Sequence, residues 1–388
     1  MNILYYQHQF PAIGGIEAVT ATLSNYFASQ GHEITIVSHI DKGLLGTGIS
    51  LDTRVVVLHM PDAQDVTRRN RDFLQQVILE RKIDIVIFQD SYAAIERNLF
   101  PAGEMVKVIT VEHSAPCFVP EFLRHYSFVR RTLWHFRHPF WKWRRTAYER
   151  NRRRFLYDQS DRYVLLSNQF YGEFRAITGL TDTRKLRAIP NPFASYLKMT
   201  QREKRNEIVF CATLTELKGC DMLLRVWGQV QSRCPDWQLT IVGNGPDRAM
   251  LERMKDDLKL ERCSFVGYKQ NPAEYFARAK IFAFPSRREG WGLVLVEAMA
   301  NGCVPVAFDS YGAIHDIVKD GECGVLVPAF DVGRFGDAIV RLAQHGEARL
   351  TMAEAGVRSA DAFAVPRVAD QWMRHLREIV VMERCMAS

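Results

Sequence analysis

Short apolar runs alternate with amphipathic helical stretches through the first half of the chain. Residues 3–6 and 83–88 are continuous apolar runs of strand length, and residues 16–29 repeat their apolar positions at helical spacing. The strands predicted in this half span residues 3–6, 33–38, 54–58, 83–88, 105–111, 161–166 and 186–189. Because helical stretches separate these strands, the pattern predicts a parallel, doubly wound sheet.

The same alternation restarts after a polar break. Pro-Asn-Pro at 190–192 and the polar run 200–206 indicate a linker. The strands predicted beyond it span residues 207–211, 237–242, 264–267, 280–284, 303–307 and 324–327, with helices at 220–233, 332–343 and 367–382. A chain of 388 residues has the length of two to three domains. We therefore expect an α/β protein with domains at residues 1–190 and 191–365 and a final helical segment at 366–388.

A charged, glycine-bearing loop follows the strand at 280–284 and leads into a helix that begins near Leu293. The first N–H groups of a helix have no intrahelical partner, so a loop that enters a helix in this way forms a site for anions. Gly290 and Gly292 allow the backbone to approach a ligand without a Cβ atom in the way. The sequence therefore predicts a phosphate site at this helix start.

Two carboxylates bracket this site, Glu289 in the loop and Glu297 on the second turn of the helix. They lie about one to two helical turns apart along the helix axis. That separation suits a ligand in which a diphosphate, lying over the helix start, joins two hydroxyl-bearing groups.

Three further features carry candidate chemistry. Gly14 and Gly15 precede the helix at 16–29, where they form either a second phosphate loop or an ordinary tight turn. Lys218 precedes the helix at 220–233 and is placed as a phosphate counter-ion, although a surface lysine without a role has the same pattern. His113 directly follows a predicted strand, and residues at such strand ends line the cleft of an open α/β sheet.

Composition narrows the class of protein. The chain is 47% apolar, its net charge is +7, and its eight cysteines are scattered without a C-x-x-C pair. We therefore expect no zinc knuckle or disulfide framework, and a reducing compartment, the cytoplasm. The first residues are typical of a strand rather than a signal peptide, and no apolar run approaches the ~20 residues that span a bilayer. The absence of a D-x-D motif predicts that no metal is required.

Residues 124–154 differ from the rest of the chain. They hold eleven Arg or Lys residues, one acid and eight aromatics, among them Trp134, Trp141 and Trp143. Cations interleaved with Trp and Phe favour an anionic membrane surface, which predicts a peripheral position on the inner face of the cytoplasmic membrane. A solvated helical face packed by aromatic stems is the alternative. Nucleic acid is disfavoured, because no nucleic-acid-binding motif accompanies the charge.

The stretch from Glu289 to Glu297 matches the E-x7-E motif of retaining glycosyltransferases with the GT-B fold. Together with the strand, the glycine loop and the helix around it, the region resembles glycosyltransferase family 4. The resemblance covers nearly the whole chain and is strongest over residues 206–342. It implies two Rossmann-like, doubly wound domains facing a central cleft, the first binding the acceptor and the second the nucleotide-sugar donor, with the final helix crossing back to the first domain.

The resemblance also implies roles for the candidate residues. Glu297 would hold the ribose hydroxyls of the donor, Glu289 would hold hydroxyls of the transferred sugar, and His113 would contact that sugar. Catalysis would rest on Glu289, His113 and Lys218, and Glu17 would lie near the acceptor or simply favour the helix dipole. The further donor-binding positions are Gly14, Gly15, Thr213, Lys218, Gly243, Val266, Gly290, Trp291, Gly292 and Leu293.

One position departs from the family pattern Gly-Arg-Leu-x-x-x-Lys-Gly. Lys218 and the glycine after it match, but an alanine and Thr213 stand where the family has Gly-Arg. Thr213 can form a hydrogen bond with phosphate but cannot neutralise it. The second cation would then be Arg287 or Arg288, which would also help to keep Glu289 ionised.

The function that the resemblance implies is transfer of a hexose-type sugar from a UDP- or GDP-linked donor, with retained anomeric configuration. The acceptor would be a hydroxyl of a glycan or a lipid-linked molecule in bacterial surface polysaccharide synthesis, such as lipopolysaccharide, capsule or exopolysaccharide. The alternatives are another GT-B activity, such as a nucleotide-sugar epimerase, and a catalytically weak donor-binding partner of a membrane glycan assembly. A dinucleotide-dependent dehydrogenase is disfavoured, because no G-x-G-x-x-G follows the first strand.

Overall fold

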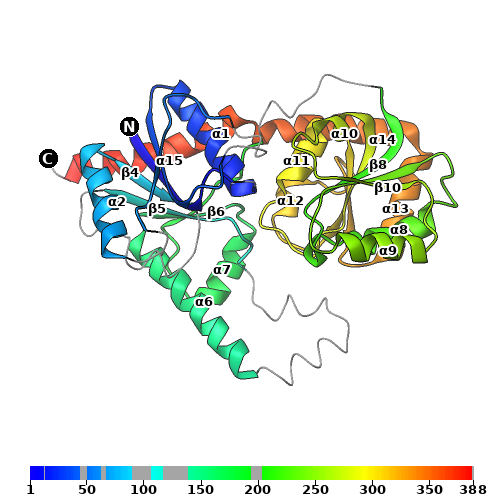
Figure 1. Cartoon of the computed structure of the whole chain (residues 1–388), viewed down its shortest axis with the longest axis horizontal. Helices are drawn as coiled ribbons and strands as arrows, with labels where there is room; N and C mark the ends of the chain where they lie inside the picture. Colours follow the sequence, from blue (N-terminus) through cyan, green and yellow to red (C-terminus); the bar gives the residue numbers. More distant parts are fainter. Residues whose placement is uncertain are drawn as a thin grey trace. The chain divides into compact units, whose positions relative to one another are not determined.

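The computed structural model describes residues 1–12, 14–43, 50–62, 67–89, 106–116, 139–193 and 203–386, with backbone alone for 139–145 and 381–386. The chain divides into two compact units. The first contains Met1–Pro192 together with Val365–Ser388, and the second contains Phe193–Ala364 (Figure 1). The C-terminal helix therefore belongs to the unit formed by the N-terminal residues.

The first unit is built on a seven-stranded sheet with the order β3-β2-β1-β4-β5-β6-β7. All of its strands are parallel, so their carboxyl ends lie along one edge. The strands are β1 (Asn2–Gln9), β2 (Glu33–Ile40), β3 (Val56–His59), β4 (Ile85–Phe88), β5 (Lys107–Glu112), β6 (Arg162–Leu165) and β7 (Leu186–Ala188). The chain changes direction across the sheet between β1 and β4, which is the usual place for a ligand site.

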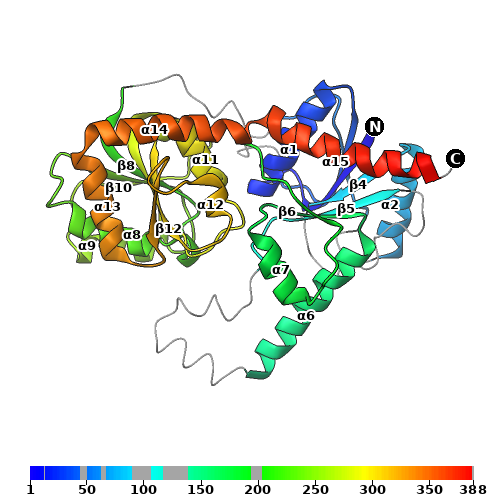
Figure 2. The same ribbon diagram turned by 180° about the vertical axis from the view of Figure 1, so that it is seen from behind.

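Helices cover both faces of this sheet. They are α1 (Gly15–Ser29), α2 (Arg68–Glu80), α6 (Pro139–Gln159), α7 (Phe170–Thr178) and α15 (Val365–Met386). Helix α1 packs against α15 and α6 packs against α7, and the two views show these pairs on opposite faces of the sheet (Figure 2). Because both faces are covered, the strands are apolar along their length, and all four residues of β4 are buried.

The second unit is built on a six-stranded parallel sheet with the order β10-β9-β8-β11-β12-β13, which switches direction between β8 and β11. Its strands are β8 (Arg205–Cys211), β9 (Gln238–Val242), β10 (Cys263–Gly267), β11 (Ala279–Phe284), β12 (Val304–Asp309) and β13 (Val325–Pro328). Its helices are α8 (Cys220–Val230), α9 (Arg248–Asp257), α10 (Ala273–Arg278), α11 (Leu293–Ala300), α12 (Ile314–Ile317), α13 (Val332–Gln344) and α14 (Gly346–Ala360), with short 3₁₀ turns at Glu216–Lys218 and Asp361–Phe363.

Two parallel, doubly wound sheets were predicted from the sequence, and this architecture is confirmed. The strand expected at 54–58 begins at Val56 instead, because Arg54 and Asp52 pair in the preceding turn at 2.6 Å. The pattern did not predict α14. Its buried face consists of Arg349, Gly356 and Ala360, which form no apolar stripe.

A buried ionic network holds α6 against the first sheet. Glu112, the last residue of β5, is fully buried and accepts from Arg153 Nη2 at 2.6 Å and from Tyr163 Oη at 2.7 Å. Burial opposes ionisation of Glu112, yet the charges and hydrogen bonds of Arg153 and then Arg152 hold its pKa below the ordinary value. Two arginines of the predicted membrane-facing segment therefore point into the protein, and both are less than 7% exposed.

We expect Arg153→Ala to lower the free energy of unfolding of the first unit by about 3–5 kcal/mol, because it leaves a buried carboxylate without its main partner. Arg154→Ala is the matched control, since its side chain is exposed on the next position of the same helix, and it should change stability by less than about 0.5 kcal/mol. Urea unfolding curves of both variants measure the difference. Equal stability of the two variants would contradict a stabilising role for the network.

Candidate functional site

The loops that follow β8, β9 and β11 meet at the carboxyl edge of the second sheet. The N–H of Ala212 donates to Val242 O at 3.1 Å and the N–H of Leu214 donates to Asn244 O at 2.9 Å, which joins the first two loops. Gly243 lies so close to its neighbour that a Cβ atom there would stand 1.9 Å from Ala212 O. The two backbones can lie this close only if residue 243 is glycine, so Gly243 has a structural role in the packing of the two loops.

An ion pair joins the loop after β8 to the loop after β11, at the switch point of the sheet. Lys218 Nζ lies 2.5 Å from Glu289 Oε1, and Ser286 Oγ donates to the same oxygen at 3.0 Å. The side chains of Lys218 and Glu289 remain 28% and 13% exposed. The structure thus brings together two residues that lie 71 positions apart in the sequence, and both remain accessible to a ligand.

Arg287, one of the two arginines that the sequence predicted to help keep Glu289 ionised, pairs with Asp221, and the role of the other, Arg288, stays a prediction. The Arg287 guanidinium donates to Asp221 through Nη1 and Nη2, at 2.8 and 2.7 Å, and its backbone N–H donates to Leu217 O at 2.8 Å. A bidentate pair of this kind fixes the loop to the start of α8. Lys218, rather than Arg287, is the cation paired with Glu289.

Glu297 lies on the second turn of α11 and faces the end of β8. Its charge contributes, after burial, to the raised pKa of the Cys211 thiol, which places the carboxylate close to that residue. No described residue donates a hydrogen bond to the Glu297 carboxylate, and burial raises its pKa to about 7. Glu297 is half-buried, and a carboxylate that has lost water contacts without gaining a hydrogen-bond donor benefits most from a ligand that brings hydroxyl donors.

The start of α11 is formed by the Trp291–Gly292 segment. Gly292 has φ 98°, in the left-handed region. Leu293 and Val294 follow it as the first residues of the helix, and their N–H groups have no carbonyl of a preceding helical turn to bind. The Trp291 side chain is only 4% exposed and its ring packs edge-to-face on Phe363 at 5.4 Å. A donor contact from Trp291 would therefore come from its backbone and not from its indole ring.

The remaining candidates of this unit lie at the same edge. Thr213 is exposed in the loop after β8, Val266 is half-buried near the end of β10, and Gly290 lies between Glu289 and Trp291. None of their side chains makes a contact that assigns it a role, so their donor-binding roles stay predictions.

In the first unit, the Glu17 side chain folds back over the start of its own helix. A Cβ atom on Gly14 would stand 2.0 Å from Glu17 Oε2, and Gln9 Nε2 donates to Glu17 Oε1 at 3.1 Å. Glu17 is 6% exposed. This position favours an interaction with the positive end of the helix dipole, and the contact with an acceptor stays a prediction. Gly15 is the first residue of α1.

His113 lies just beyond β5, beside the residue that follows β4. Its Nε2 is 2.6 Å from Gln89 Oε1, and burial lowers its pKa to about 4, so the ring is neutral at physiological pH. With Gln89 Oε1 as acceptor, Nε2 carries the proton and Nδ1 keeps its lone pair. Nδ1 is buried and has no hydrogen-bond partner among the described residues. It is ready to accept a hydrogen bond from a ligand hydroxyl.

Sequence reasoning missed three residues that shape these sites: Ser286, Tyr311 and Gln89. Ser286 could have been found by its position three residues before Glu289. Gln89 directly follows a predicted strand, as His113 does, and the same rule could have identified it. No sequence pattern could have identified Tyr311, because its contact with the loop depends on the pairing of β11 with β12.

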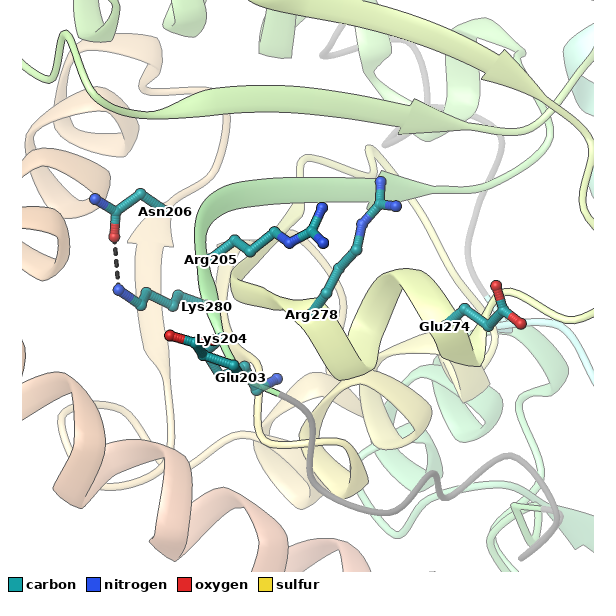
Figure 3. Close-up of a pocket in the computed structure, with 7 residues that line it drawn as sticks. All are labelled: Glu203, Lys204, Arg205, Asn206, Glu274, Arg278 and Lys280. Atoms are coloured by element: carbon teal, nitrogen blue, oxygen red, sulfur yellow. Dashed lines mark hydrogen bonds between the residues drawn. The ribbon is translucent and has the colours of Figure 1, made fainter.

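A pocket of about 570 Å³ lies at the opposite edge of the second sheet, around the first residues of β8 and β11 (Figure 3). Three of its cations, Lys204, Arg278 and Lys280, already serve the structure, and the fourth, Arg205, is exposed. Lys204 Nζ donates to three backbone carbonyls at 2.6–2.8 Å, Arg278 pairs with the buried Glu207 at 2.9 Å, and Lys280 donates to Asn206 Oδ1 at 2.6 Å. This pocket is therefore not the candidate site.

Within the described parts of the chain, no cluster of three His, Cys, Asp or Glu residues is arranged to hold a metal ion. The described helices include none that is long and apolar enough to cross a bilayer.

Two family models match consecutive parts of the chain. The model for glycosyltransferase family 4 matches residues 13–194, and the model for group 1 glycosyl transferases matches residues 197–358. The chain is also similar to solved structures over nearly its whole length. HepE from Anabaena, solved in complex with UDP, superposes with a TM-score of 0.74 at 17% identity, over 97% of this chain and all of that one. The GT-B fold expected from the sequence is confirmed.

Among curated relatives, a poly(glycerol-phosphate) alpha-glucosyltransferase of Bacillus subtilis is 25% identical over 224 residues, which is 57% of this chain and 33% of that protein. A GDP-mannose-dependent alpha-(1-6)-phosphatidylinositol monomannoside mannosyltransferase of Mycolicibacterium smegmatis is 34% identical over 169 residues, 41% of this chain and 44% of that protein. The chain spans between about a third and a half of the length of these two relatives.

Glu297 makes the stability of the second unit depend on pH. Its pKa is about 7 in the folded protein against an ordinary value of 4.5, so the folded state binds the proton more tightly than the unfolded state. As pH rises from 4.5 to 7, ionisation of this carboxylate therefore lowers the free energy of unfolding, and above pH 7 the total loss is roughly 1–3 kcal/mol. Glu297→Gln removes this effect.

We expect the melting temperature of Glu297→Gln to exceed that of the wild type at pH 8 and to approach it at pH 5. Glu347→Gln, at an exposed position on α14, is the control and should not widen its difference from the wild type over the same range. A Glu297→Gln difference that stays constant between pH 5 and pH 8 would show that this carboxylate titrates normally.

Proposed function

Because this chain belongs to glycosyltransferase family 4, we propose that it transfers a hexose-type sugar from a UDP- or GDP-linked donor to a hydroxyl group. The observation that carries the proposal is the Lys218–Glu289 ion pair at the switch point of the second sheet, 2.5 Å across and beside the start of α11. At the carboxyl edge of this sheet, the cation and the helix start suit the diphosphate of a nucleotide sugar, and the carboxylate suits the hydroxyls of its sugar.

Each part of the donor has a partner in the second unit. The diphosphate lies over the first N–H groups of α11, where the helix dipole favours negative charge, and Lys218 adds a full positive charge. Glu297 accepts hydrogen bonds from the ribose hydroxyls, and these hydrogen bonds replace the water contacts that its carboxylate has lost. Glu289 exchanges part of its pairing with Lys218 for the hydroxyls of the transferred sugar.

The reaction breaks the bond between the anomeric carbon of the sugar and the oxygen of the diphosphate. The acceptor oxygen attacks the same face of the oxocarbenium-like sugar, and the departing phosphate takes the acceptor's proton. The products are a glycoside with retained configuration and a nucleoside diphosphate. Fixed N–H groups and Lys218 stabilise the charge that develops on the leaving group without reorganising during the reaction.

His113 of the first unit is the further residue to which we assign contact with the transferred sugar. Because its ring is neutral and its Nδ1 has no partner among the described residues, it serves as a hydrogen-bond acceptor for a sugar hydroxyl and not as a cation. The pKa of about 4 keeps this role constant across the physiological pH range.

The proposed acceptor is a glycan or a lipid-linked molecule of a bacterial surface polysaccharide. The names of the relatives from Bacillus subtilis and Mycolicibacterium smegmatis indicate a polymer of glycerol phosphate and a phosphatidylinositol mannoside as the molecules on which those proteins act.

We propose a reaction without metal, since the sequence holds no D-x-D motif. The alternative is a donor-binding subunit with little activity, which Thr213 favours, because it leaves Lys218 without the second cation of the family pattern.

The proposed membrane contact involves the outer face of α6. Of the segment 124–154, residues 124–138 lie outside the described residues, so the prediction for them is not tested. On the described turns Tyr148, Arg150 and Arg154 are exposed, whereas Arg152 and Arg153 bind Glu112. We therefore assign contact with lipid phosphates to Arg150 and Arg154, with Tyr148 at the headgroup level.

The proposed donor is tested by thermal-shift measurements with UDP, GDP, ADP and their common sugars, without added metal. A ligand that binds the native state raises the melting temperature by mass action, so one nucleotide should give a selective increase. With the donor thus identified, Glu289→Ala should lower turnover by a factor of about 100 or more while the protein stays folded. Binding without turnover by the wild type would support the donor-binding subunit, and no binding at all would refute both functions.

The membrane contact is tested by sedimentation with vesicles of phosphatidylglycerol and phosphatidylethanolamine. Arg150→Gln combined with Arg154→Gln should weaken binding about ten- to thirty-fold, at about 1 kcal/mol for each cation near the surface. Arg341→Gln combined with Arg358→Gln is the control, since it removes the same charge from exposed positions of the second unit. An equal loss in both pairs would mean that net charge, and not α6, attracts the vesicles.

A further inference from the structure

Besides the side-chain contacts of Arg287 and Glu289 described above, three hydrogen bonds among the described residues hold the backbone of the loop between β11 and α11. The N–H of Arg287 donates to Leu217 O at 2.8 Å, and Ser310 Oγ donates to Ser286 O at 2.7 Å. The third tie comes from the hydroxyl of Tyr311, which donates to Trp291 O at 2.9 Å. Of these three hydrogen bonds, the first two hold the beginning of the loop and the third acts on the residue next to Gly292, where the helix begins.

Tyr311 reaches this position from the loop after β12. Because β12 pairs with β11, the two loops leave the sheet side by side, and the Tyr311 side chain is only 8% exposed. Its hydroxyl occupies the space beside Gly292, where a Cβ atom would stand 2.7 Å from it. Residue 292 must therefore be glycine both for its φ of 98° and for the space that Tyr311 takes.

The Tyr311 hydroxyl stays protonated in this environment. Burial, and after it the charge of Glu289, raise its pKa well above the ordinary value. It remains a hydrogen-bond donor to the Trp291 carbonyl throughout the physiological pH range. The Trp291 ring packs on Phe363 at 5.4 Å, so this residue is held at its side chain and at its carbonyl.

A fixed carbonyl determines the direction of the next N–H group. The peptide bond is planar and trans, so the oxygen of Trp291 and the amide hydrogen of Gly292 point in opposite directions. With the oxygen held by the buried Tyr311, the Gly292 N–H points away from Tyr311, and no described residue accepts its hydrogen bond. The N–H groups that follow it at the start of α11 take their positions from this peptide.

We propose that Tyr311 is a positioning residue for the donor diphosphate: its hydroxyl holds the Trp291–Gly292 peptide so that Gly292 N–H and the first N–H groups of α11 point at the phosphates. This inference rests on the proposed function for the identity of the ligand. Tyr311 itself touches neither the phosphates nor the sugar.

The first test needs no ligand. Hydrogen exchange is measured on wild-type protein, Tyr311→Phe and Ser310→Ala, in peptides that cover residues 286–296. Tyr311→Phe should speed exchange near residues 290–294 by about five- to ten-fold, the effect of losing one hydrogen bond of about 1 kcal/mol. Ser310→Ala removes the tie at the other end of the loop and should leave those amides within about twofold of the wild type. Unchanged exchange in Tyr311→Phe would overturn the proposal.

The second test separates positioning for phosphate from general loosening. UDP is compared with uridine, and GDP with guanosine, by calorimetry on the same three proteins. Tyr311→Phe should weaken binding of the diphosphate that the wild type accepts about tenfold and should change binding of the matching nucleoside less than about twofold. An equal loss for the two ligands, or an equal loss in Ser310→Ala, would overturn the proposal. Failure of the wild type to bind either diphosphate would refute the proposed function, and the assignment to phosphate with it, while the exchange result would still decide whether Tyr311 holds the loop.

Discussion

Parallel strand pairing is the constraint on which the candidate donor site depends. It delivers the carboxyl ends of β8, β9, β11 and β12 to one edge of the second sheet, so loops that are far apart in the sequence become neighbours. Lys218 and Glu289 meet because β8 and β11 are adjacent at the switch point, and Tyr311 meets Trp291 because β12 lies next to β11. Neither Gly243 nor Gly292 has space for a side chain, because the backbone of Ala212 lies against the first and the Tyr311 hydroxyl against the second.

Among the described residues, each unit has a fully buried carboxylate that pairs with an arginine. Glu112 binds Arg153 of α6 in the first unit, and Glu207 binds Arg278 at the end of α10 in the second. A buried charge without its partner is costly, so each pair fixes a helix against its sheet. Among the α6 cations whose side chains the structure describes, Arg152 and Arg153 are therefore structural, whereas Arg150 and Arg154 are exposed.

The chemistry that we propose needs few charged groups, because the backbone provides much of the stabilisation. The start of α11 offers oriented N–H groups, and Lys218 lies beside them. Arg287, one of the two arginines that could have compensated for Thr213, is held by Asp221. The more the leaving group depends on correctly aimed N–H groups, the more the contacts that hold this loop matter for the proposed reaction.

The sequence by itself determined the order of the strands, the two doubly wound sheets, and the identity of the residues next to strand ends. These properties follow from local periodicity and from the rule that ligands bind at the carboxyl ends of parallel strands, so Glu289, Glu297, Lys218 and His113 could be named before the structure. Only the tertiary structure decided which of these residues pair with each other. It paired Lys218 with Glu289, turned Arg287 toward Asp221, folded Glu17 over its own helix and buried two arginines of α6, because side-chain partners are set by contacts across strands that no local pattern encodes.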